Sequence, residues 1–405
     1  MPPSSLLPAE VGRGPNDPLG VIIAAVAVVG VALGLLIFNI WFERKQVART
    51  QDRLGPNRVG PWGVFQTIAD VLKLLTKEVI FPANADPAVY WMAPILAAGS
   101  VIMIWAVMPF SPVKIGTDLN VGVLYVVAIG SLGTIGVLTA GWGSNNKYAL
   151  LGGLRMVAQV VSYEVPLVLS LLVPVMLAGT MSMQGLVVAQ GGMWFLVMSP
   201  VAALIFLISS QAEVGRAPFD LTEGESEIVA GYHIEYSGTA FAMFYLGEWM
   251  HAFVVSALFA TLFLGGWQGP GATEVPALGL IYFLVKSYFV YFVLNWLRFT
   301  VPRIRIDQLL SLNWKFLVPV ALINLVMTAV VDRIVTTAIA VDPNASAFIQ
   351  TLPRAGVLFL ANVALMGVIL IVLREVARRE RARVEALVDE GVFSAPAVEA
   401  APAEG

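Results

Sequence analysis

Long runs of hydrophobic residues, separated by shorter polar segments, dominate the chain. Several of these runs reach the roughly 20 residues that an α-helix needs to cross the hydrocarbon core of a membrane. The pattern therefore predicts an all-α polytopic membrane protein with about nine transmembrane helices. The predicted spans cover residues 20–42, 88–108, 121–142, 154–178, 194–213, 238–266, 277–300, 315–335 and 354–376.

The segment 61–80 has a different hydrophobic period. Its apolar residues recur every three or four positions, with polar residues on the other face: Phe65, Ile68, Leu72, Leu75 and Val79. This spacing predicts an amphipathic helix that begins at Pro61 and lies along the membrane surface. A packed helix of a small extramembrane cap is the alternative, and both interpretations place the segment at the interface.

Composition and charge support a membrane protein and predict its orientation. Of the 405 residues, 58% are hydrophobic and 13% are charged, whereas charged residues make up about a quarter of soluble domains. If the spans alternate in direction, nineteen of the 24 lysine and arginine residues fall on one side. The positive-inside rule then predicts an outside N-terminus and a cytoplasmic C-terminus. We expect an extracytoplasmic tail over 1–19, a membrane domain over 20–376 and a partly disordered cytoplasmic tail over 377–405.

Several kinds of site are not expected. The N-terminal segment does not have the form of a cleavable signal peptide, because its first apolar run is too long. The chain has no cysteine and only two histidines, so we expect no disulfide, no iron–sulfur cluster and no metal site of its own. No phosphate loop, dinucleotide fingerprint or nucleophile triad occurs.

Four ionisable residues fall inside the predicted spans, namely Glu164, Glu213, Glu248 and Lys286. A charged side chain in a membrane is costly unless it is paired or neutral, so such residues are candidates for function. Structural ion pairs are the alternative for any single one of them. Three glutamates on successive helices favour a path for protons, although a cation site is a second interpretation.

The segment 213–236 concentrates six carboxylates around a single arginine, Arg216. We expect Pro218 to end the preceding helix and Arg216 to compensate the charge of Glu213. Asp220 and Glu223 have the spacing of a helix capping box. Glu223, Glu225 and Glu227 follow at intervals of two. Acids this dense raise one another's proton affinity, although capping and solvation of a loop would also explain them.

Two further polar segments flank the spans. Glu43 and Arg44 emerge together from the first span and are expected to form an ion pair, followed by two Gly-Pro dipeptides that predict a rigid turn. After the seventh span, we expect Arg303, Arg305 and Asp307 to brace loops against each other or against a partner protein. Anchoring at the inside end of the first span is the simpler explanation for Lys45, Arg49 and Arg53.

Five stretches closely resemble a known family: "LGPNRVGPWGVFQTIADVLKLLTKE", "LRMVAQVVSYEVPL", "AEVGRAPFDLTEGESEIVAGYHIEYSG", "PRIRIDQLLSLNWK" and the short "ERK". They are similar to the quinone-site membrane subunit of respiratory complex I, the NADH:quinone oxidoreductase, over roughly residues 20–376. The resemblance implies a subunit without redox groups that forms the entrance and wall of a quinone chamber and couples quinone reduction to proton translocation.

The resemblance also implies roles for individual residues. Its quinone-chamber positions fall on Glu43, Arg44, Trp62, Phe65, Asp70, Phe219, Phe241 and Tyr245. Its proton path falls on Arg155, Glu164, Glu213, Arg216, Asp220, Glu223, Glu225, Glu227 and Glu248. His233, Trp249 and Lys286 receive no role, because relatives vary at the first two positions and the role of Lys286 is equally open.

The resemblance implies the surroundings of the chain as well. Quinone, either ubiquinone or menaquinone, is the expected substrate, and FMN and iron–sulfur clusters are expected in other subunits. The expected partners are peripheral-arm subunits, small membrane subunits and antiporter-like subunits in a bacterial plasma membrane, with no nucleic acid. A related membrane-bound hydrogenase and a free-standing cation/proton antiporter are the alternatives.

Overall fold

The computed structural model describes residues 18–113, 116–221, 229–338 and 347–389, and these ranges are helical, without a β-strand. They contain eight helices that are long and apolar enough to cross a membrane, which confirms the predicted all-α membrane fold. These are α1 (Pro18–Thr50), α3 (Pro87–Ile104, extended by η2, Trp105–Val107), α4 (Gly122–Gly143), α5 (Lys147–Ala178), α10 (Gly238–Phe263), α11 (Pro276–Thr300), α13 (Val318–Ala338, preceded by α12, Ile306–Leu312, and η4, Asn313–Leu317) and α14 (Ala347–Asp389).

The ninth predicted span, 194–213, is not one continuous helix. It is divided into α7 (Phe195–Met198) and α8 (Pro200–Glu213), after the short helix α6 (Met183–Ala189). Ser199 between them has non-helical dihedral angles, and Pro200 has no amide hydrogen to continue the helical ladder. The 14 residues of α8 span about 21 Å at 1.5 Å per residue. This is less than the roughly 30 Å of a hydrocarbon core.

The predicted amphipathic helix is shorter than expected. Pro61 begins a separate turn, η1 (Pro61–Gly63), and α2 begins only at Gln66 and ends at Thr76. Trp62 and Gly63 both have positive φ, which interrupts the helix between Pro61 and α2. A Cβ on Gly63 would lie 2.2 Å from the Pro56 carbonyl oxygen, so the Gly-Pro segment folds tightly back on itself as predicted.

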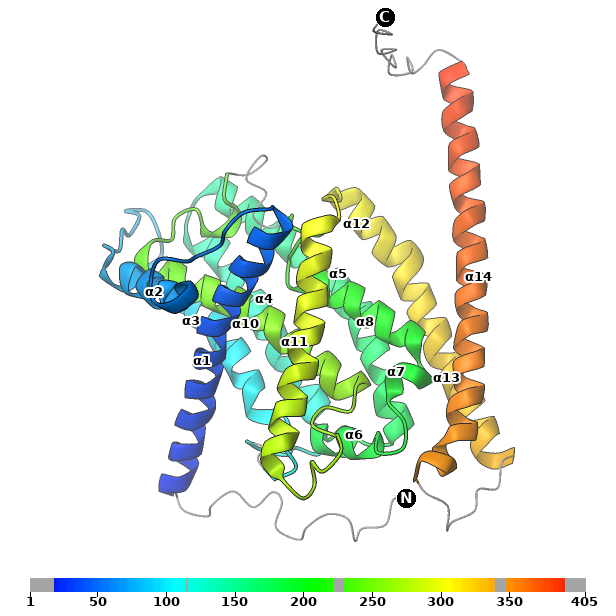
Figure 1. The fold of residues 1–405 in the computed structure, drawn as a ribbon. Helices are drawn as coiled ribbons and strands as arrows, with labels where there is room; N and C mark the ends of the chain where they lie inside the picture. Colours follow the sequence, from blue (N-terminus) through cyan, green and yellow to red (C-terminus); the bar gives the residue numbers. More distant parts are fainter. Residues whose placement is uncertain (1–17, 114–115, 222–228, 339–346, 390–405) are drawn as a thin grey trace, which may run out of the picture.

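The apolar face of α2 is exposed along Ile68, Leu72 and Leu75. The helix packs against α1 and α10 and lies across the direction of α1 (Figure 1). An exposed apolar face on a helix that lies across the spans fits a position at the membrane surface.

The helices α3, α4 and α5 pack in sequence, and α10 lies at the centre of the assembly. Most of α10 is buried, and its aromatic and aliphatic side chains form the middle of the largest hydrophobic cluster. The helices α13 and α14 pack on one side, and α14 extends well past the other helices at the end where α1 terminates (Figure 1). The last predicted span therefore continues beyond 376 as one helix, to Asp389.

Buried amides fix the segment that follows α8. The Gln159 side chain on α5 donates to the carbonyl oxygens of Ala212 at 2.7 Å and Phe219 at 2.8 Å. The chain therefore leaves α8 at Glu213 and turns back against α5. Pro218 lies beyond this turn and does not itself end the helix, contrary to the prediction.

Pro166 on α5 helps to position α13. Because proline lacks an amide hydrogen, it leaves the carbonyl of Ser162, four residues earlier, without its helical partner. Asn313 in η4 donates its amide to that carbonyl at 2.6 Å. The bond ties the start of α13 to α5 at the level of Glu164.

Candidate functional site

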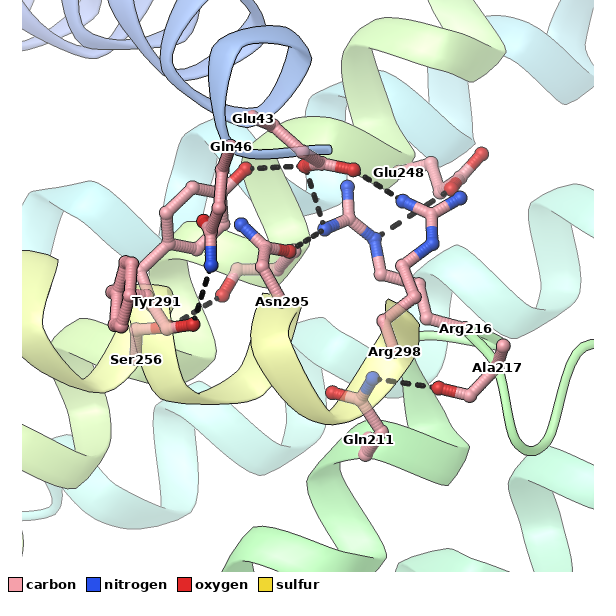
Figure 2. Close-up of polar contacts among 12 residues, drawn as sticks. Glu43, Gln46, Gln211, Arg216, Ala217, Glu248, Ser256, Tyr291, Asn295 and Arg298 are labelled. Carbon is pink, nitrogen blue, oxygen red and sulfur yellow. Dashed lines mark hydrogen bonds and ion pairs between the residues drawn. The ribbon is translucent and has the colours of Figure 1, made fainter. Parts of the chain in front are cut away.

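Glu43, in the last part of α1, is the centre of a buried polar network (Figure 2). Its carboxylate accepts a hydrogen bond from Arg216 Nη1 at 2.9 Å and one from the Tyr291 hydroxyl at 2.7 Å, and it pairs with Arg298. Only 3% of Glu43 is accessible. A carboxylate this buried remains charged only when it is paired and hydrogen-bonded, and the network supplies both.

Arg216 links this carboxylate to a second acid. Its Nη1 also donates to Asn295 Oδ1 at 3.0 Å, and its Nε lies 3.8 Å from Glu248 Oε1 on α10. The guanidinium also lies over the Trp249 ring, 5.1 Å from its centroid. Arg216 therefore joins the post-α8 turn to α1 and α10 through ion pairs and to α11 through a hydrogen bond.

Two predicted ion pairs are different in the structure. Arg44 pairs with Asp70 on α2, and not with Glu43. Arg216 pairs with Glu43 and Glu248, and not with Glu213. Both predictions relied on proximity along the chain. Glu43 and Arg44 are successive residues of a helix, so their side chains point in different directions. Arg216 lies beyond the end of α8 at Glu213, so helical spacing does not bring these two side chains together.

The Arg44–Asp70 pair connects α1 to the amphipathic helix, and it is only partly buried. Gln66 adds a hydrogen bond to the Asp70 carboxylate at 3.2 Å. Partial burial favours the neutral carboxyl group, but the hydrogen bonds from Arg44 and Gln66 and the charges of Arg44 and Lys73 outweigh it. Together these interactions lower the pKa of Asp70, so this acid is ionised at neutral pH.

The aromatic residues that the resemblance places at a quinone chamber fall into three settings. Trp62 and Phe65, next to α2, are exposed by 77% and 51%. Phe241 and Tyr245 on α10 are half-buried, with ring centroids 4.5 Å apart, and His233 of η3 (Gly231–His233) lies edge-on to both. Phe219 is instead buried against Tyr163 of α5, with centroids 5.5 Å apart.

A small internal cavity lies beside the Arg216 network. Its volume is about 80 Å³, and it is bounded by α3, α4, α5, α10 and the segment after α8. Its ionisable lining residues are Glu213, Asp220, Glu248, His251 and Arg298. This volume suits a few water molecules, because each needs roughly 10–15 Å³ of cavity volume measured in this way. It is far below the 300–1,000 Å³ typical of pockets for small-molecule ligands.

A second cavity of about 30 Å³ extends from the first toward Glu164. Glu164 on α5 accepts a hydrogen bond from the Ser131 hydroxyl on α4. Glu213 and His251 line both cavities, and His251 Nε2 lies 3.8 Å from Glu213 Oε1. The structure thus brings together acids from three parts of the sequence, Glu164, Glu213 with Asp220, and Glu248, along two neighbouring cavities. The second cavity is otherwise lined mostly by apolar residues.

The remaining predicted site residues lie elsewhere. Glu223, Glu225 and Glu227 fall outside the described residues, as does the predicted capping box with Asp220. Arg155 is half-buried on α5. The side chains of Arg303, Arg305 and Asp307 are exposed. The loop that carries them is braced by its backbone, because the Ile304 amide donates to the Pro218 carbonyl at 3.0 Å.

Part of the Glu43–Arg216 network was not predicted from the sequence. Tyr291, Asn295 and Arg298 all contact Glu43 or Arg216 from α11. Their spacing of four and three positions places them on one face of that helix, and this pattern was available as a signal. The sequence did not single out His251, and nothing in its sequence neighbourhood reveals its contact with Glu213.

Lys286, left without a role, has a structural one. Its ammonium group donates to the carbonyl oxygens of Leu264 at 2.7 Å and Gln268 at 2.8 Å, just beyond the last residue of α10. It also lies over the Trp194 ring, 4.9 Å from the centroid. A cation at the C-terminal end of a helix satisfies free carbonyls and interacts favourably with the helix dipole.

Comparison with known proteins gives a consistent result. The family model described as NADH dehydrogenase matches residues 22–329. A relative from Brevibacillus brevis is 49% identical over 312 residues, which cover 76% of this chain and 92% of the relative. A relative from Chlorobaculum tepidum is 49% identical over 333 residues, covering 77% and 92%. One from Dehalococcoides mccartyi strain CBDB1 is 49% identical over 299 residues, covering 74% and 83%.

All three relatives are named as the H subunit of NADH-quinone oxidoreductase. The matched region includes α1, the Gly-Pro turn, α2 and every residue of the Glu43–Arg216 network. This chain belongs to the family formed by the H subunits of NADH-quinone oxidoreductases.

Proposed function

We propose that this chain is a membrane subunit of a proton-pumping NADH:quinone oxidoreductase, and that it couples quinone reduction to proton translocation. It carries no redox group in this proposal, and the flavin and iron–sulfur clusters belong to partner subunits. The names of its relatives support an oxidoreductase complex that acts on NADH and quinone. The arrangement of its buried acids supports the coupling role.

The observation that carries the coupling role is the shared lining of the two cavities. Glu213 borders both, so it stands between the acids near the Arg216 network and the acid at Glu164. Reduction of a quinone takes up two protons and leaves transient negative charge nearby. Negative charge favours protonation of neighbouring carboxylates. Protons would then move from Asp220 and Glu248 through Glu213 toward Glu164.

The quinone site itself would require a second subunit. The two internal cavities are too small for a quinone, and the aromatic side chains of Trp62 and Phe65 face outward. We assign the entrance to the region where α2, η1 and the first turns of α10 meet, with Arg44, Asp70, Phe241 and Tyr245 on this chain's wall. Peripheral-arm subunits with the terminal iron–sulfur cluster would close the chamber. Small and antiporter-like membrane subunits would receive the protons.

We assign the opposite ends of the helices to the two sides of a bacterial plasma membrane. The end of α1, the helices α2 and α12 and the long extension of α14 share one end of the molecule (Figure 1). These segments contain nine of the 24 arginine and lysine residues, and alternation of the predicted spans puts nineteen on this side. The positive-inside rule then makes this end cytoplasmic. The N-terminus then faces outward. In this assignment 20–376 forms the membrane domain, between the tails 1–19 and 377–405.

The alternative functions receive less support. Neither the relatives' names nor the family description refers to a hydrogenase or an antiporter. An antiporter acting alone would also leave the Arg44–Asp70 contact and the aromatic group around Phe241 without a purpose. The acids that line the cavities fit either proton coupling or ion transport. The family relationship therefore favours coupling to quinone reduction.

A Glu213→Gln substitution tests the proposal. The amide keeps the size and hydrogen-bonding capacity of the side chain but does not exchange a proton. We expect NADH:quinone reduction and formation of a pH gradient in membrane vesicles to fall together, and Glu213→Asp to retain part of both. NADH:ferricyanide reduction should be unchanged, since electrons leave before they reach the membrane arm. Full quinone reduction and pumping in assembled Glu213→Gln complex would reject the coupling role.

A further inference from the structure

His251 occupies the point where the two cavities adjoin. Four residues line both spaces: Ile104, Gly130, Glu213 and His251. Only Glu213 and His251 among them can take up or release a proton. The imidazole Nε2 lies 3.8 Å from the Glu213 carboxylate. The two residues belong to different helices, so their approach is created by the packing of α8 against α10.

The surroundings of His251 define its charge environment. Glu248 lies three positions earlier on the same helix and pairs with Arg216. Glu213 faces the ring from α8, and Glu164 borders the second cavity from α5. From α3 and α4 the neighbours are Ile104 and Gly130, which carry no charge. About 20% of the His251 side chain and 15% of the Glu213 side chain are accessible, and both residues line the two cavities.

We propose that His251 is a proton-relay residue that passes protons from Glu213 toward the second cavity. The inference rests on the proposed coupling function and extends it to a residue outside the acidic series. An imidazole suits this position because one ring nitrogen can accept a proton while the other releases one. The two nitrogens would thus give the space between the two cavities a second titratable group beside the Glu213 carboxylate.

The transfer conserves protons and involves no redox change. The protonated Glu213 carboxyl group gives its proton to His251 Nε2, which leaves a carboxylate beside an imidazolium. The imidazolium then releases the proton on Nδ1 to water in the second cavity, on the side of Glu164. A flip of the neutral ring then turns its unprotonated nitrogen toward Glu213, ready to accept the next proton. At 3.8 Å the first step needs a small side-chain movement or one bridging water.

A purely structural role makes a different prediction from a relay role. As a fixed polar partner of Glu213, His251 would be replaceable by an amide of similar size. Asparagine and glutamine both offer a hydrogen-bond donor and acceptor, but neither takes up a proton. The substitutions His251→Asn and His251→Gln therefore separate the two roles. Ser256→Ala is a matched control on α10, because the Ser256 hydroxyl bonds to the Ala252 carbonyl of its own helix and borders neither cavity.

The experiment uses the complete complex in membrane vesicles. NADH:quinone reduction and pH-gradient formation are measured from about pH 6 to 8.5, a range that begins near the pKa of a free imidazole. Each activity is normalised to NADH:ferricyanide reduction. We expect both histidine variants to lose at least about tenfold in both activities. This is less than the roughly 10²–10⁴-fold typical of an acid–base group at a reacting centre, because water in the cavities offers a slower route. The Ser256→Ala complex should match the wild type throughout.

A parallel Glu213→Gln variant separates this inference from the proposed function. Loss of activity in Glu213→Gln, together with wild-type rates and pH profile in either histidine variant, would overturn the relay while leaving the function intact. Unchanged pumping in Glu213→Gln would reject the function itself. Failure of both histidine variants to assemble would assign His251 to folding and would also overturn the relay.

Discussion

The buried network around Glu43 makes a quantitative prediction about two arginines, Arg216 and Arg44. Arg216 is 3% accessible and pairs with Glu43 and Glu248. Arg44 is adjacent to Glu43 in sequence, yet it pairs with Asp70, and the two side chains are 38% and 24% accessible. We therefore expect Arg216→Ala to destabilise the protein strongly and Arg44→Ala to have a small effect.

The magnitudes follow from burial. Removing one partner of a buried ion pair costs about 3–5 kcal/mol, because the other charge remains without compensation. The cost would be moderated here by Arg298 and Tyr291, which still contact Glu43. Exposed pairs contribute about 0.2–1 kcal/mol. The two substitutions should thus differ by roughly 2–4 kcal/mol, which corresponds to roughly 30- to 700-fold in a folding equilibrium.

Retention of assembled complex during heating measures this difference. Membranes that contain each variant are heated in steps, solubilised in mild detergent and separated on a native gel, and the intact complex is stained for NADH oxidation. Arg216→Ala should lower both the initial amount of complex and the temperature at which half of it survives. Arg216→Lys should recover part of the loss, because it keeps the charge without the forked geometry.

A double substitution provides the control. In a cycle of Glu43→Gln and Arg216→Ala, the loss in the double variant should be clearly smaller than the sum of the single losses, since each single change removes the same interaction. Equal losses for Arg44→Ala and Arg216→Ala, or additivity within the cycle, would refute the assignment of Arg216 as the main partner of Glu43.

Three further predictions follow from other parts of the fold. For topology, a thiol reagent that does not cross membranes should label Lys147→Cys only from the cytoplasmic side and Thr273→Cys only from outside, and the reverse pattern would invert the assigned orientation. Gly152→Ala should impair assembly on native gels, because its Cβ would lie 2.6 Å from the Gly231 backbone, whereas Gly99→Ala, with no atom within 4 Å, should assemble normally. Lys286→Met should lower the stability by about 1.5–3 kcal/mol, the contribution of hydrogen bonds from a charged group, and make the segment 264–275 more sensitive to added protease, with Lys286→Arg intermediate. Equal protease resistance of the wild type and both variants would show that the Lys286 bonds are unimportant.

The sequence by itself determined the class of fold and most element positions. Hydrophobic runs of sufficient length specify spanning helices without reference to any contact, because the cost of exposing backbone groups to lipid depends on length and polarity alone. The period of segment 61–80 similarly indicated α2. Charge asymmetry supplied an orientation. Five sequence stretches resemble the quinone-site membrane subunit of complex I, and the comparison with known proteins confirms the family.

Sequence patterns located the ends of several elements less well. Ser199 and Pro200 divide the predicted span 194–213, and positive φ at Trp62 separates Pro61 from α2. Such breaks depend on the dihedral angles of single residues, which tertiary contacts select. The average hydrophobicity of a segment does not reveal such breaks.

Only the tertiary structure decided which charged groups meet. Glu43 contacts Arg216 and Arg298, which are 173 and 255 positions away, and His251 approaches Glu213 across two helices. The energy of an ion pair depends on distance and burial in space, whereas sequence proximity suggested Arg44 for Glu43 and Arg216 for Glu213. The intramembrane acids were recognisable individually from their cost in lipid. Their order along two adjoining cavities is a property of how α3, α4, α5, α8 and α10 pack together.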